Sequence, residues 1–221
     1  MKRSVRLKVL MAAMAMVCGL SACTSTGTQT TAYSSTQPQN NRSDAQIYMF
    51  RGGFNGVFST GITDMATELR RRGVPAQDLS WAASNVSLDK IRKSVAANPQ
   101  AGPIILAGHS LGASSVIGMA RKLTREDIEV DLVIVFDPLG STRVPKGVRK
   151  LINFKASGKR SNPGGFAPGP GVNGEIVNVD MRNLPDLDKS SHWNIVNQAA
   201  LQRRVIREIE SEYARFKRRV S

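Results

Sequence analysis

PIILAGHSLG, residues 103–112, joins an apolar run to a G-x-S-x-G pentapeptide, and a segment with helical periodicity follows directly. The run Ile104–Ala107 is typical of a strand that is buried on both faces. After the pentapeptide, apolar residues recur at the spacing of one helical face, at Leu111, Val116, Ile117, Ala120 and Leu123. The stretch therefore predicts a strand, a sharp turn at Ser110 and a helix. The two glycines let strand and helix approach closely, and the turn lifts the serine hydroxyl toward solvent.

Ser110 is a candidate nucleophile, but a serine hydroxyl needs a base to take its proton. The usual base is a histidine that is oriented by a carboxylate. The chain has two histidines, and His109 lies inside the pentapeptide, so His192 is the candidate base. Asp137 is the candidate acid because it directly follows the apolar run Leu132–Phe136, and open α/β sheets place their sites at the carboxyl ends of their strands.

These residues resemble the sites of α/β-hydrolases of the lipase, esterase and thioesterase kind, and the resemblance covers about Asp44–Tyr213. Three blocks carry it: GHSLG at Ser110, VIVFDPLG around Asp137, and SHWNIV around His192. The order Ser, Asp, His along the chain agrees with this family and differs from the chymotrypsin and subtilisin orders. The resemblance implies a three-layer α/β fold with a mostly parallel sheet.

The loop that follows the first predicted strand, Ile47–Phe50, resembles the glycine-bearing loop that supplies one backbone N–H to the oxyanion hole in this family. The other N–H would come from Leu111. Many members have His-Gly at the start of this loop, whereas residues 51–52 are Arg-Gly here, so the loop donor is either Gly53 or Phe54. Each such donor is typically worth about 3 kcal/mol of transition-state stabilisation.

Other carboxylates compete with Asp137 for the role of the acid. In many relatives the acid follows a later strand, and Asp180 ends such a predicted strand here. Asp186 and Asp188 lie close to His192 in the sequence. Asp137 is preferred, and Asp180 is the main alternative.

Residues 1–22 have the organisation of a signal peptide, with four basic residues, the apolar run Val9–Leu20 and then small residues. Leu20-Ser21-Ala22-Cys23 resembles the bacterial lipobox, which implies removal of residues 1–22 and lipidation of Cys23. A signal cleaved without lipidation and an uncleaved membrane anchor are the alternatives, although the run is short for a bilayer. Because Thr24 rather than Asp follows the cysteine, the resemblance favours the outer membrane, with the protein facing the periplasm.

Residues 24–43 are rich in Ser, Thr, Gln and Asn and have almost no large apolar side chains, so they are predicted to form a flexible tether. Its root-mean-square reach is about 25 Å. The remaining residues, 44–221, are enough for one domain with one substantial core.

The net charge of the chain is +14, and removal of residues 1–22 with their four basic side chains leaves +10. In an exported protein, this charge favours contact with anionic envelope components over nucleic acid, with a solvated basic surface as the alternative. The only cysteines are Cys18 and Cys23, so no disulfide is expected in the mature domain. The sequence shows neither a metal-binding cluster nor a phosphate-binding glycine loop, so no cofactor is expected.

Strand-like and helix-like segments alternate through residues 44–221, which predicts a parallel sheet with helices on both faces. A first helix spans Ile62–Leu69 and ends before Gly73, and Ser87 is expected to cap a second. Later strands are predicted at 148–156 and 175–180. The Gly- and Pro-rich segment 157–174 between them is expected to contain neither helix nor strand, and an amphipathic helix at 201–216 ends the domain.

These features favour an envelope-anchored serine hydrolase that cleaves carboxylic esters, thioesters or lipids. The three motif blocks are separated by short intervals, so no large lid is expected, and an open site suits short acyl chains or a lipid surface. The competing interpretation is a non-catalytic envelope lipoprotein that uses the fold for binding. Transfer of the acyl group to an acceptor other than water would use the same residues.

Overall fold

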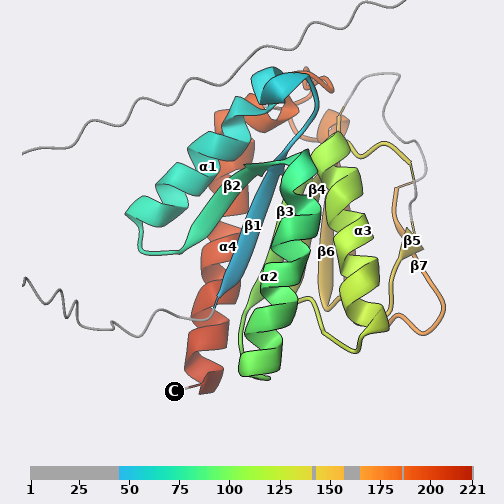
Figure 1. Ribbon diagram of the computed structural model, residues 1–221. Coiled ribbons are helices and arrows are strands. Elements are labelled where there is room, and N and C mark those ends of the chain that lie inside the picture. Colours follow the sequence, from blue (N-terminus) through green and yellow to red (C-terminus); the bar gives the residue numbers. More distant parts are fainter. Residues whose placement is uncertain (1–44, 141–142, 157–164, 186, 221) are drawn as a thin grey trace, which may run out of the picture. The chain divides into compact units, whose positions relative to one another are not determined.

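The computed structural model describes residues 45–140, 143–156, 165–185 and 187–220. Their centre is a six-stranded sheet in the order β2-β1-β3-β4-β6-β8, and every pair of neighbouring strands in it is parallel (Figure 1). The strands are β1 (Gln46–Arg51), β2 (Ala76–Ser80), β3 (Ile104–His109), β4 (Leu132–Phe136), β6 (Lys150–Lys155) and β8 (Glu175–Asp180). The predicted signal peptide, Cys23 and the predicted tether lie outside the described residues.

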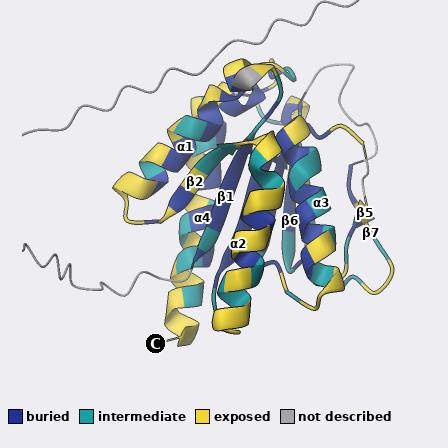
Figure 2. Cartoon of the chain, in the orientation of Figure 1, coloured by how far each residue is buried: buried dark blue, intermediate teal, exposed yellow. Residues whose placement is uncertain are grey.

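Helices cover both faces of the sheet, as the alternating pattern predicted. The helices α1 (Thr60–Arg71) and α4 (Ala199–Val220) pack on one face, and α2 (Ser84–Ala97) and α3 (Leu111–Arg125) pack on the other (Figure 1). The central strands are dark blue in Figure 2, which marks them as buried on both faces, whereas the outer sides of the helices are exposed. The predicted three-layer α/β fold with a mostly parallel sheet and helices on both faces is confirmed.

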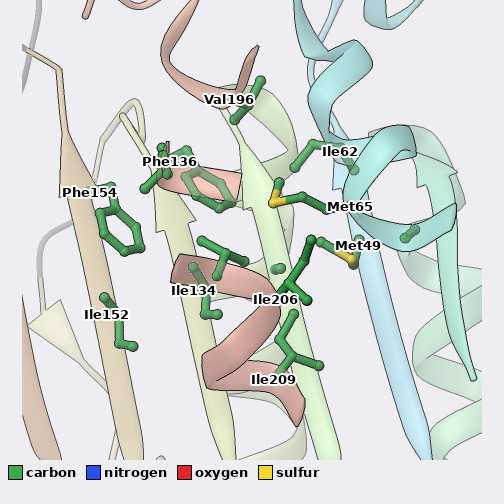
Figure 3. Close-up of a cluster of buried hydrophobic side chains, with 14 of the residues drawn as sticks. Met49, Ile62, Met65, Ile134, Phe136, Ile152, Phe154, Val196, Ile206 and Ile209 are labelled. Carbon is green, nitrogen blue, oxygen red and sulfur yellow. The ribbon is translucent and has the colours of Figure 1, made fainter. Parts of the chain in front are cut away.

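Two apolar cores hold these layers together. The core under α1 and α4 is shown in Figure 3, where side chains from the sheet, from both helices and from the short helix η4 (Ile195–Asn197) meet. It includes Met49, Ile62, Met65, Ile134, Phe136, Ile152, Phe154, Val196, Ile206 and Ile209. The predicted apolar stripe of the terminal helix is confirmed, because Leu201, Val205 and Ile209 on α4 are fully buried.

Two elements differ from the sequence-based expectation. The second helix begins at Ser84 rather than after Ser87, which lies within α2 and is buried. The reason is that the short helix η2 (Trp81–Ala83) leads directly into α2, and the Ser80 hydroxyl caps η2 by accepting a hydrogen bond from Ala82 N–H. The edge strand β2 was not predicted, because its sequence AQDLS has no apolar run.

The expectation that residues 157–174 contain no strand is wrong for their described part. Ala167–Pro168 form the two-residue strand β7, which pairs in parallel with β5 (Arg143–Val144) to make a separate small sheet. A proline is compatible with this position because an edge strand does not require every N–H to donate.

Candidate active site

Ser110 occupies the sharp turn between β3 and α3, with φ 55° and ψ −117°. The turn requires glycine on both sides. A Cβ on Gly108 would lie 2.4 Å from the carbonyl oxygen of Gly112, and a Cβ on Gly112 would lie 2.3 Å from the carbonyl oxygen of Phe50. Such contacts are too short for any larger residue. The backbone of Ser110 is therefore held in a left-handed conformation that is rare for a residue with a side chain.

The structure brings together the three residues that the sequence singled out. The Nδ1 atom of His192 lies 2.7 Å from Oδ2 of Asp137, and its Nε2 atom lies 2.9 Å from Oγ of Ser110. An ionised carboxylate only accepts hydrogen bonds, so Nδ1 carries the proton and donates it to Asp137. In the neutral ring, Nε2 then has a lone pair and accepts a hydrogen bond from the Ser110 hydroxyl. This is the arrangement in which a histidine can act as a general base.

Asp137 reaches this site from the turn after β4. Its side chain is buried, and its Oδ1 atom accepts a hydrogen bond from the N–H of Ala156 at 3.3 Å. Its own N–H donates to the carbonyl oxygen of Phe154 at 2.9 Å, and its φ of 44° is again in the left-handed region. The neighbouring strand β6 thus helps to hold the carboxylate in place.

The alternative acid, Asp180, has different partners. Its carboxylate binds the guanidinium of Arg182 and the ammonium of Lys155, at 3.2 Å for the latter. Hydrogen bonds from Arg182 hold the pKa of Asp180 well below its ordinary value. Asp186 lies outside the described residues.

The candidate oxyanion donors border the same space as the serine hydroxyl. Leu111 is the first residue of α3, where backbone N–H groups have no partner within the helix and the helix dipole is positive. Across from it, the N–H of Gly52 is engaged, because it donates to Oγ of Ser59 at 3.0 Å. Gly53 and Phe54 therefore stay the two candidates on this loop. Phe54, like Ser110, has a left-handed backbone, with φ 51°.

A cavity of about 230 Å³ opens beside Ser110. Apolar side chains form most of its wall, and aromatic rings gather at its rim: the Phe58 and Trp193 rings lie 4.7 Å apart, and Phe54 lies 6.3 Å from each. Phe54 is 75 % exposed, which is unusual for so large an apolar residue. The cavity is lined by Gly52, Gly53, Phe54, Phe58, Ser59, His109, Ser110, Leu111, Leu139, His192 and Trp193.

Sequence reasoning missed part of this wall. Trp193 and Leu139 lie within the motif blocks SHWNIV and VIVFDPLG, so their positions beside His192 and Asp137 were a usable signal. Phe58 and Ser59 belong to the short helix η1 (Phe54–Ser59), whose sequence FNGVFS shows no strand or helix periodicity that would have marked it.

His109, to which the sequence assigns no role, is almost completely buried next to the site, at 1 % exposure. Its Nδ1 atom lies 2.7 Å from Oγ of Ser59, and its Nε2 atom lies 2.8 Å from the carbonyl oxygen of His192. Burial lowers the pKa of His109 to about 4. The hydrogen bond with the His192 backbone opposes this change, and the smaller contributions of the His192 ring, which lowers the pKa, and of Asp137, which raises it, act in opposite directions. The ring is therefore neutral at neutral pH.

This lowered pKa makes stability depend on pH. The unfolded chain takes up a proton at His109 near pH 6.5, whereas the folded chain resists doing so until about pH 4. Because the unfolded state binds more protons between these values, the free energy of unfolding falls as the pH drops from 6.5 to 4, by up to about 3 kcal/mol from this residue. Urea unfolding at a series of pH values should show this loss in the wild type and a smaller loss in His109→Gln. Equal pH dependence of the unfolding free energy in both proteins would contradict the assignment of this loss to His109.

Among the described residues, no cluster of side chains could hold a metal ion, and no helix combines the length and apolar character needed to cross a membrane.

No family model and no curated protein matches this chain. A crystal structure from Xanthomonas campestris pv. campestris, described provisionally as a hydrolase of the alpha/beta superfamily, is similar to it. The two chains are 13 % identical, and the match covers 75 % of this chain and 98 % of that one, with a TM-score of 0.45.

Proposed function

We propose that this protein is a serine hydrolase that cleaves carboxylic esters or thioesters through an acyl-enzyme on Ser110. The observation that carries this proposal is the continuous hydrogen-bonded chain from Ser110 Oγ through His192 to Asp137, with distances of 2.9 and 2.7 Å. The lipobox-like sequence that ends at Cys23 supports placing this activity at a bacterial envelope, with the domain tethered to a membrane by a lipid.

In the first half of the proposed reaction, Ser110 Oγ attacks the carbonyl carbon while His192 Nε2 takes the hydroxyl proton. The carboxylate of Asp137 stabilises the imidazolium that forms. When the tetrahedral intermediate collapses, His192 gives this proton to the departing alcohol or thiol, and the acyl group stays on Ser110. In the second half, water attacks the acyl group while His192 takes its proton, and the carboxylic acid leaves as Ser110 regains its hydrogen.

The negative charge that develops on the carbonyl oxygen needs donors that are already aimed at it. The N–H of Leu111 and one N–H from Gly53 or Phe54 border the cavity on the side of Ser110, which suits them to this role. The N-terminal end of α3 adds its dipole at the same point.

The size and lining of the cavity favour a substrate with a short, uncharged acyl group. Its volume of about 230 Å³ is below the range of roughly 300–1,000 Å³ that is typical of sites for drug-sized ligands. None of the described residues that line it carries a permanent charge. An apolar acyl chain would bury surface against Phe58, Leu139 and Trp193, which favours binding, whereas a carboxylate or ammonium would lose its hydration without a partner.

Para-nitrophenyl esters of increasing acyl length test the proposal. We expect kcat/KM to rise about tenfold from acetyl to butyryl, because added methylenes bury apolar surface, and to fall by dodecanoyl, which the cavity cannot enclose. Trp193→Ala removes one wall and should move the optimum toward longer chains. The proposal fails if the folded protein hydrolyses neither these esters nor the matching thioesters, and tight binding of an envelope component by such a protein would favour the non-catalytic alternative.

A further inference from the structure

A second series of hydrogen bonds lies beside the candidate triad, and its central residues, Ser59 and His109, have no part in the proposed reaction. It begins at the N–H of Gly52, which lies 3.0 Å from Ser59 Oγ, and continues from Ser59 Oγ to His109 Nδ1 at 2.7 Å. It ends where His109 Nε2 meets the carbonyl oxygen of His192 at 2.8 Å. Ser59 and His109 are each only 1 % exposed. Water therefore has little access to these bonds.

The direction of every bond in this series follows from chemistry. A carbonyl oxygen can only accept, so Nε2 of His109 carries the ring proton and donates to His192. The ring is neutral, as its burial requires, so Nδ1 has a lone pair and accepts the hydroxyl hydrogen of Ser59. The oxygen of Ser59 then accepts the N–H of Gly52. Every donor and acceptor in this series therefore has a partner, and no other placement of the hydrogens gives each of them one.

Both ends of this series of hydrogen bonds lie outside the helices and strands, at Gly52 and at His192. Gly52 precedes the loop residues Gly53 and Phe54, and a Cβ on Gly52 would lie only 3.1 Å from Ser110 Cβ. His192 lies in an irregular segment between η3 (Met181–Asn183) and η4. Asp137 holds the ring of His192, whereas His109 holds its backbone.

We propose that His109 is a positioning residue that sets the place of the His192 backbone and, through Ser59, the place of the oxyanion loop relative to Ser110. This role rests on the proposed function, because it concerns the geometry of that reaction. His109 is the last residue of β3, immediately before the nucleophile, so the centre of the sheet is the reference from which the His192 backbone and the oxyanion loop are placed. Small displacements of such groups lower the reaction rate strongly, since a misplacement of about 1 Å is enough to slow a reaction about 100-fold.

Substitutions at His109 distinguish positioning from packing. His109→Phe fills the space but offers no hydrogen bond, so kcat should fall about 30- to 100-fold while KM changes less than about threefold. His109→Gln retains a donor that can reach the His192 carbonyl and should recover at least about tenfold of this loss. Ser59→Ala breaks only the link to Gly52 and should give an intermediate loss.

Ile91→Ala is the matched control, because Ile91 is a fully buried residue on α2 outside the cavity wall. It should lower the free energy of unfolding by about 2–5 kcal/mol. Its kcat per folded molecule should equal that of the wild type. The proposal is overturned if His109→Phe behaves like this control, with lower stability and unchanged kcat, or if His109→Gln is no better than His109→Phe.

A measurement without substrate keeps this test separate from the test of the proposed function. Imidazole ¹⁵N spectra should show His109 as neutral and protonated on Nε2, and the low-field proton on His192 Nδ1 should be visible in the wild type but lost or shifted in His109→Phe. Exchange of the Gly52 amide with deuterium should be faster in Ser59→Ala. An unchanged His192 proton in a folded His109→Phe variant would refute the positioning role even if no ester were a substrate.

Discussion

Replacing Ser110 with alanine should lower kcat for the best ester by about 10⁴- to 10⁶-fold, because the variant has no nucleophile and keeps only the binding surface and the oxyanion donors. Stability should change little, since the substitution removes one oxygen at the edge of a cavity. Steady-state kinetics and urea unfolding of the same preparations measure both quantities.

Ser115→Ala is the control for this variant. Ser115 lies on α3, the helix that begins after Ser110, and its hydroxyl donates to the carbonyl oxygen of Trp81 at 3.4 Å. Its loss should change kcat less than about twofold, as is usual for a surface side chain away from the chemistry. If Ser110→Ala keeps more than about a tenth of the wild-type rate, a hydrolytic mechanism through this serine is excluded.

Asp137→Asn should lower kcat by about 10⁴-fold. The cause is the tautomer of His192. An asparagine amide can donate to Nδ1, which would leave the proton on Nε2, and a protonated Nε2 cannot accept the hydrogen of Ser110. The geometry of the site would stay almost intact while its chemistry was lost, so KM should change much less than kcat.

Asp180→Asn is the matched control, because Asp180 also lies at the carboxyl end of a strand of the sheet, as the last residue of β8. Its carboxylate is bound to Lys155 and Arg182, so its replacement should leave kcat within about twofold and alter stability by less than about 1 kcal/mol. The opposite pattern, with activity lost in Asp180→Asn and kept in Asp137→Asn, would assign the acid to the later strand.

Strand patterns predicted the nucleophile and the acid because parallel pairing places equivalent strand ends side by side. His109 on β3 pairs with Phe136 on β4, so the next residues on the two strands, Ser110 and Asp137, leave the sheet together. Two apolar runs and the residues that follow them were enough to foresee this. His192 lies on an irregular segment, and no strand or helix pattern pointed to it; the scarcity of histidines and the resemblance of the block SHWNIV did.

The remaining features depend on contacts that no local pattern records. The strand β2 is polar because it lies at the edge of the sheet and pairs only with β1. Ser59 and His109 are 50 positions apart in the chain, and their hydrogen bond exists only because η1 folds back over the end of β3. The aromatic rim of the cavity also depends on a contact between distant segments, since Phe58 and Trp193 lie near opposite ends of the domain's sequence. Such pairings are properties of the folded chain rather than of any one segment.

The central claim is that Ser110 is an activated nucleophile, and covalent labelling of residues 44–221 with a fluorophosphonate probe tests it most directly. Such probes react with serines that a base has activated, so mass mapping should find one label per molecule, on Ser110, and none in Ser110→Ala. An absence of labelling in protein shown to be folded, or a label on another residue, would contradict the claim.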